Sequence, residues 1–80
     1  MSGPRLDARS KLGRAVFQLV DASMKMPVDV RTMVVRIRNV VEMDPEDKMM
    51  RFKLRGDMDA LSKNQRLNPL IRMLFKAMPT

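Results

Sequence analysis

The side chains in this sequence that could do chemistry are basic residues and carboxylates, because histidine and cysteine are both absent. Without these two residue types, the usual nucleophile–base dyads and triads cannot be assembled. The commonest transition-metal ligand and all thiolate ligands are missing too. The three glycines, Gly3, Gly13 and Gly56, lie too far apart to form a phosphate-binding loop. We therefore predict a protein that is not an enzyme and has no metal site and no cofactor.

Most of the carboxylates lie in one stretch, from Glu42 to Asp59. Asp57 and Asp59 are two residues apart, a spacing that does not place them side by side on a helix. A calcium-binding loop needs a different spacing and a central glycine. We interpret the carboxylates as helix caps and as partners in ion pairs four residues apart. These pairs are Asp44–Lys48, Asp47–Arg51 and Arg55–Asp59.

Basic residues outnumber acidic ones by sixteen to nine, which gives a net charge of +7 and an isoelectric point near 10.9. The excess is uneven, because residues 41–60 carry a net charge of −2 whereas residues 61–80 carry four basic residues and no acidic one. A positive charge of this size favours nucleic acid or an acidic protein as a partner. The alternative is that the charge only keeps a small protein soluble.

We predict that eight basic residues form a surface that reads the phosphate backbone of duplex RNA or DNA. They are Arg9, Lys11, Arg14, Arg31, Arg38, Arg66, Arg72 and Lys76. The planar guanidinium of arginine suits contacts to phosphate. The aromatic residues are three phenylalanines, Phe17, Phe52 and Phe75, which argues against a stacking platform for single strands.

Methionine is frequent, with ten in 80 residues. Its flexible side chain fills irregular cores and also suits adaptable binding surfaces. The alternative function is therefore a protein–protein interaction or oligomerisation module with a Met-rich apolar surface. Because a chain this short buries only a small core, we also expect a homodimer. The predicted interface residues are Val35, Met49, Phe52 and Met58.

Four internal prolines divide the chain, and each precedes a stretch with helical apolar spacing. Proline suits the first position of a helix because its missing N–H would have no partner there. We predict a single all-α domain of four helices, at about residues 5–24, 28–43, 45–62 and 69–78, with residues 1–4 disordered. We expect Asp44 and Asn68 to cap the third and fourth helices. Gly56 is expected to bend or end the third helix.

An α+β fold with a basic hairpin at about residues 33–55 is the alternative. Apolar and basic residues alternate in residues 35–38 and again in residues 50–55, as they do in half-buried strands. The connection between these segments contains no glycine, and the acidic residues at 44–47 make sense as a helix start. The four-helix fold is therefore preferred.

The longest apolar runs are triplets, such as those at residues 33–35 and 73–75. A membrane span needs roughly 18 consecutive apolar residues. The N-terminal residues also lack the apolar region of a signal peptide. We expect an intracellular protein, cytoplasmic or nuclear, that is neither secreted nor transmembrane and has no membrane partner.

Overall fold

The computed structural model describes Asp7 and residues 9–78, and this part of the chain forms four α-helices and no strand. The helices are α1 (Lys11–Ser23), α2 (Val28–Met43), α3 (Lys48–Leu61) and α4 (Asn68–Ala77). The prediction of an all-α fold with four helices is confirmed. Residues 33–55, where a hairpin was the alternative, lie in α2, in α3 and in the connection between them. Residues 1–4, which we expected to be disordered, lie outside the described part.

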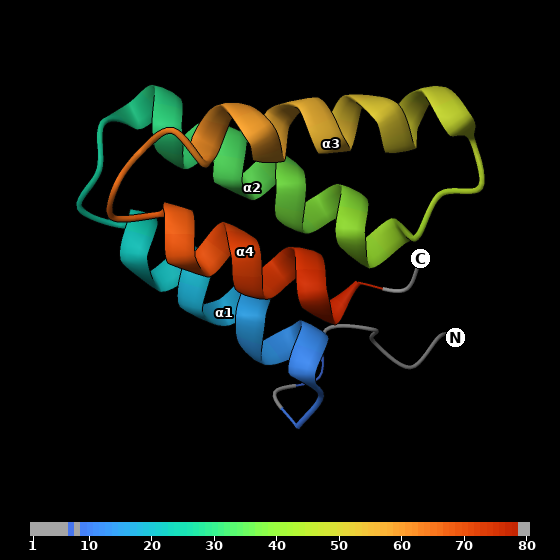
Figure 1. Ribbon diagram of the computed structural model, residues 1–80, viewed down its shortest axis with the longest axis horizontal. Coiled ribbons are helices and arrows are strands. Elements are labelled where there is room, and N and C mark those ends of the chain that lie inside the picture. The colour runs from blue at the N-terminus through green and yellow to red at the C-terminus, as the bar shows by residue number, and fades with distance from the viewer. Residues whose placement is uncertain (1–6, 8, 79–80) are drawn as a thin grey trace.

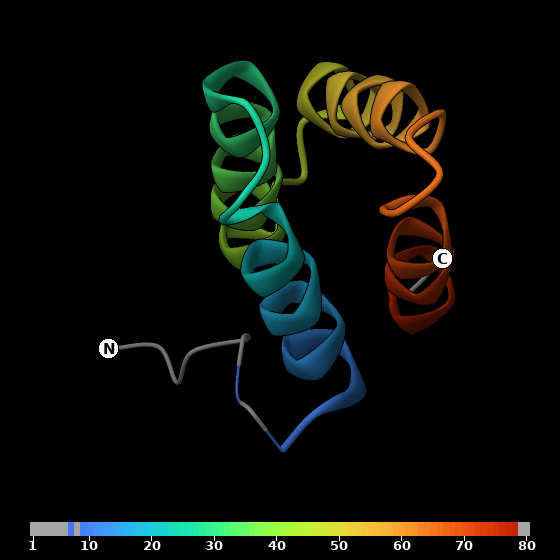
Figure 2. The ribbon, with the colours of Figure 1, turned by 90° about the vertical axis from the view of Figure 1, so that its left-hand side faces the viewer.

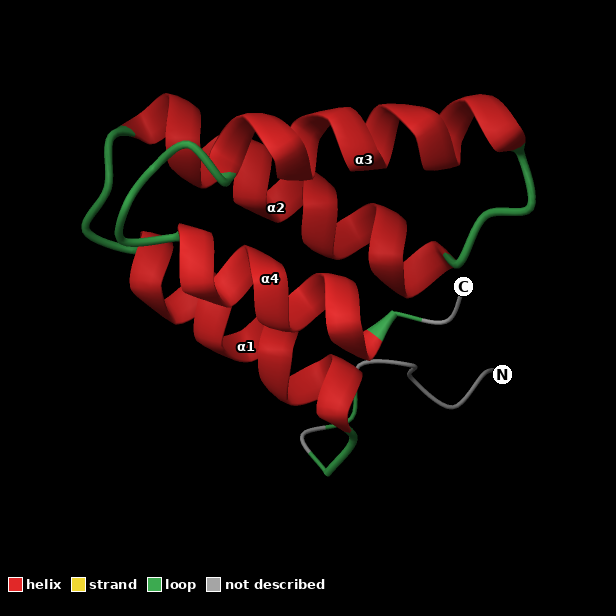
Figure 3. Ribbon diagram, viewed as in Figure 1, coloured by secondary structure: helices red, strands yellow, loops and turns green. Residues whose placement is uncertain are grey.

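The four helices form a closed ring in which each packs on two neighbours. In this ring α1 packs on α2 and α4, and α3 packs on α2 and α4 (Figure 1, Figure 2). Consecutive helices run in opposite directions, so the α1–α2 and α3–α4 connections lie at one end and the α2–α3 connection at the other (Figure 3). As a result α1 and α3 lie diagonally opposite each other.

The core lies inside this ring and consists of twelve buried apolar side chains. They are Ala15, Val16, Leu19, Val34, Ile37, Val41, Leu54, Met58, Leu61, Leu67, Ile71 and Leu74. Apart from the adjacent pair Ala15 and Val16, those within one helix recur at intervals of three or four residues, the spacing of one helical face. Leu67 lies in the turn before α4. The buried hydroxyl of Ser23 donates a hydrogen bond to the carbonyl of Val20 (2.7 Å), so this polar group is satisfied inside the core.

The first helix begins at Lys11, six residues later than predicted. The hydroxyl of Ser10 accepts a hydrogen bond from the amide of Gly13 (2.9 Å), which is an N-cap contact. The same hydroxyl and the Ser10 amide both donate to the carbonyl of Asp7 (2.9 and 3.0 Å). The segment leading into α1 thus folds back over the helix. A Cβ atom at Gly13 would overlap the backbone carbonyl of Asp7, so glycine is needed there.

The prediction that Asp44 caps the third helix is wrong. Asp44 adopts a left-handed conformation (φ 51°) and ends α2 instead, a conformation that Asp tolerates better than most residues. The cap of α3 is Asp47, whose carboxylate accepts hydrogen bonds from the amides of Met49 (2.7 Å) and Met50 (3.3 Å). Gly56 does not end α3, which continues to Leu61.

One of the ion pairs expected four residues apart, Asp47–Arg51, is replaced by other contacts. The carboxylate of Asp47 is used in the cap, and Arg51 donates instead to the carbonyl of Glu46 (3.2 Å). An ion pair joins α2 to α3, between Arg36 and Asp57 (3.1 Å), although its partial exposure limits its contribution to about 1 kcal/mol or less.

The prediction that Asn68 caps the fourth helix is also wrong, because Asn68 is the first residue of α4. Its side-chain amide donates to the carbonyl of Ser62 (2.8 Å), which fixes the connection from α3. The carboxamide oxygen of Asn64 accepts hydrogen bonds from the amides of Arg66 (2.9 Å) and Leu67 (3.2 Å). Asn64 therefore orders the turn before α4.

Replacing Gly13 by alanine is expected to destabilise the protein, whereas replacing Gly56 by alanine is expected to stabilise it. At Gly13 the clash with the Asp7 carbonyl costs roughly 1–3 kcal/mol, which outweighs a helix-propensity gain of about 1 kcal/mol. At Gly56 an added Cβ meets nothing within 4 Å, so only the gain of about 0.5–1 kcal/mol remains. Thermal unfolding at low protein concentration measures both. A stabilised Gly13→Ala variant would show that Asp7 does not pack over α1.

Candidate nucleic-acid interface

A groove between α1 and α4 brings together residues from the two ends of the described chain. Its lining residues are Lys11, Arg14, Ala15 and Gln18 from α1, and Met73, Lys76 and Ala77 from α4. Because the two helices are antiparallel, the start of α1 lies beside the end of α4. The residues Lys11, Arg14 and Gln18 are spaced three and four apart, so they share one flank of α1.

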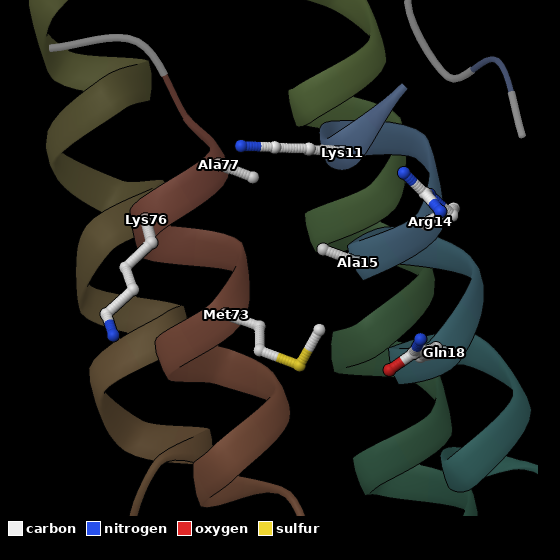
Figure 4. A pocket seen from close by; sticks show the side chains of 7 residues that line it. All are labelled: Lys11, Arg14, Ala15, Gln18, Met73, Lys76 and Ala77. Carbon is white, nitrogen blue, oxygen red and sulfur yellow. The ribbon is translucent and has the colours of Figure 1, made fainter. Parts of the chain in front are cut away.

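The side chains in this groove do not all point the same way (Figure 4). Lys11 extends from α1 toward Ala77, and Met73 extends from α4 toward α1. Lys76 points away from α1, along the outer side of α4. The cations thus come from both helices that border a partly apolar groove, Lys11 and Arg14 from α1 and Lys76 from α4.

The charge of the molecule is concentrated on the half that contains this groove. Residues 7–23 and 62–78, which hold α1, α4 and their preceding turns, contain seven basic and two acidic residues. Residues 24–61, which hold α2 and α3, contain eight basic and seven acidic residues. The α1–α4 half therefore has a net charge of +5, and the α2–α3 half is nearly neutral.

Three of the eight basic residues predicted to bind phosphate, Lys11, Arg14 and Lys76, line the groove. Arg72 is exposed on α4, one turn before Lys76, and Arg9 is exposed in the segment before α1. We define the α1–α4 face as these five residues.

The other three predicted residues lie elsewhere. Arg66 is exposed in the turn before α4 and does not line the groove. Arg31 and Arg38 are exposed on α2, which does not pack on α4. The eight residues therefore do not form one surface.

Sequence reasoning did not single out Gln18 and Met73 as site residues, although both line the groove. The signal for Gln18 was its spacing, since it lies four residues after Arg14 on the same flank. Met73 gave no such signal, because it belongs to an apolar triplet and its 42% exposure depends on how α4 packs against α1.

The predicted apolar interface is partly exposed and partly buried. Met49 (76%), Phe52 (77%) and Val35 (45%) are exposed. Met58 is not exposed at all (0%), so its assignment to an interface is wrong. It lies four residues after Leu54 on the inner face of α3 and belongs to the core. Met50 is only half-buried, so of this adjacent pair Met49 faces the solvent.

In the described part of the chain, no group of three or more Asp, Glu, His or Cys side chains is arranged to hold a metal ion. No helix there combines the length and the apolar character needed to cross a membrane.

In comparisons with known proteins, no family model matches this chain, and no curated protein or solved structure is significantly similar to it. The arguments for function therefore depend on the geometry and charge of the chain itself.

Truncating Met58 to alanine is expected to cost about 2–5 kcal/mol of unfolding free energy, because it leaves a cavity in the core. The same truncation at Met49, in the same helix, should change stability by no more than about 0.5 kcal/mol, since this side chain is largely exposed. Denaturant titration at low protein concentration compares the two. Equal losses would contradict the assignment of the two methionines to opposite faces of α3.

Proposed function

We propose that this protein binds nucleic acid, without catalysis, through contacts between the α1–α4 face and the phosphate backbone of a duplex. The observation that carries the proposal is the separation of charge: a net +5 on the α1–α4 half against near neutrality on the α2–α3 half. If the charge served only solubility, nothing would require it to lie on one side of the molecule.

The charge on the α4 side of this face favours binding of an anion. From Ser62 to Met78 the chain has four basic residues and no acidic one, so no carboxylate of this segment competes with phosphate for the cations. On the α1 side, Arg14 supplies a planar guanidinium that can donate two hydrogen bonds to one phosphate, and Lys11 supplies a compact charge. Both stand on a packed helix, so their backbone is already ordered and little backbone entropy is lost when they bind.

Backbone recognition is preferred over reading of bases. None of the residues that line the α1–α4 groove is aromatic, so the groove offers no ring on which bases could stack. Phe17 is exposed on α1 (47%), but it lines a separate hollow with Val20, Asp21 and Met24. Phe75, the one aromatic residue of α4, is half-buried, and the guanidinium carbon of Arg55 from α3 lies 6.0 Å from the centre of its ring. We therefore expect binding with strong salt dependence and little preference for sequence. An intracellular location, cytoplasmic or nuclear, is part of this proposal, because nucleic acids are found there.

A second candidate function, protein–protein interaction, is supported by a different observation, the exposure of Met49 and Phe52 on α3. Because α3 lies diagonally opposite α1 in the ring, this apolar surface and the α1–α4 face are separate. The two functions can therefore coexist. The homodimer that we expect for so short a chain belongs to this second proposal.

Removing Lys11 and Lys76 together, by substitution with alanine, is expected to weaken binding to random-sequence duplex DNA and to reduce its salt dependence. Each lost phosphate contact lowers the slope of log K against log salt by about 0.9. The matched control is the double substitution Lys25→Ala and Lys53→Ala, which removes the same charge from the α2–α3 half. Fluorescence anisotropy over a range of salt concentrations measures both variants, with duplex RNA as a second ligand.

The control variant is expected to keep nearly the affinity of the unmodified protein. No binding of either duplex by the unmodified protein at low salt would disprove the proposal. Equal weakening by the two double substitutions would show that the charge acts as a whole and that the α1–α4 face is not the site.

A further inference from the structure

The outer face of α3 carries an apolar stripe that nothing in the described chain covers. Its residues are Met49, Phe52, Gly56 and Ala60, which we call the α3 seam. They are spaced three, four and four residues apart, the spacing of residues along one side of a helix. Met49 (76%) and Phe52 (77%) are the most exposed of the large apolar side chains.

The α3 seam has a recess at its centre. The inner face of α3 is fixed in the core by Leu54 and Met58, so Gly56 points to the solvent, and an added Cβ would have no neighbour within 4 Å. A shallow hollow with a mainly apolar surface lies alongside, lined by Met49, Met50, Phe52, Lys53, Gly56 and Asp57. The seam thus has a large side chain, Phe52, next to a recess at Gly56 that a large side chain of another molecule could fill.

We propose that a second copy of this chain packs its α3 antiparallel against the α3 seam. In a twofold antiparallel pair, each flank of one helix faces the same flank of the other. Lys48 and Asp59 lie on the same flank of the seam, at opposite ends of α3, and both are exposed. Lys48 of each copy therefore lies beside Asp59 of the other, so the same ion pair forms twice.

The same register also matches the apolar side chains. With the twofold axis near the level of Leu54, Phe52 of one copy lies over Gly56 of the other, and Met49 lies over Ala60. Large side chains then meet small ones along the whole seam, and the two opposed helix dipoles attract each other. A parallel pair would place Phe52 against Phe52 and leave the two recesses at Gly56 facing each other.

Each copy contributes only one helix, α3, so the interface is small. A stable complex usually buries about 800 Å² on each partner, which is more than the outer face of a 14-residue helix can supply. The dimer is therefore expected to be weak and to depend on concentration. It leaves the α1–α4 face of both copies open, since α1 is diagonally opposite α3.

Sedimentation equilibrium over a wide range of protein concentrations tests this interface. The unmodified protein should form a dimer at high concentration, and Phe52→Glu should raise the dissociation constant at least tenfold. The control is Val28→Glu, which places the same charge at a similarly exposed apolar residue (66%) on α2 and should leave the dimer unchanged. Circular dichroism confirms that both variants remain folded.

Charge reversal tests the antiparallel register. Lys48→Glu and Asp59→Lys should each weaken the dimer, and the two together should restore it. Both single changes place a favourable charge at their end of the helix dipole, so weakening cannot be attributed to loss of α3. A protein that stays monomeric at the highest concentration would overturn the proposal. So would a Phe52→Glu variant that still dimerises, a Val28→Glu variant that dissociates, or a double reversal that does not restore the dimer.

Discussion

The packing of α1 on α4 is the contact on which the rest of the molecule depends, because it joins the first helix to the last and closes the ring. Both helices bury apolar side chains in the common core, Val16 and Leu19 from α1 and Ile71 and Leu74 from α4. Only this contact places cations from the two ends of the chain along one groove. The packing of α1 on α4 therefore both closes the core and positions the cations of the α1–α4 face.

Much of the helix plan could be predicted from the sequence, because each helix has a clear apolar stripe. The bounds of α2 agree with the prediction, residues 28–43. The starts of α1 and α3 were less accurate, because prolines were taken as first helical residues. Ser10 and Asp47 are the actual caps. Both are good capping residues, but the start of α1 also depends on Gly13, whose contact with Asp7 involves the fold of the preceding segment.

The candidate site was harder to predict, because the spacing of residues in one helix does not say which other helix it will face. For that reason the sequence could not predict that Lys11 and Lys76 line one groove or that Arg31 lies away from it. Met58 is a different case. Its position four residues after Leu54 already placed it on the apolar stripe of α3, so the sequence contained the information that assigns it to the core. Phe52 lies off that stripe, and its predicted exposure agrees with the structure (77%).

The ring also has a consequence for how folding and binding are related. Of its four helix contacts, three join neighbours in sequence, which can form early and quickly. The contact between α1 and α4 must bring together segments about fifty residues apart, so it bears most of the entropy cost of closing the chain. A polyanion that bridges Lys11 and Lys76 would bind only after this closure, and its binding energy would add to that of the native state. Binding of the polyanion and packing of α1 on α4 would then each favour the other.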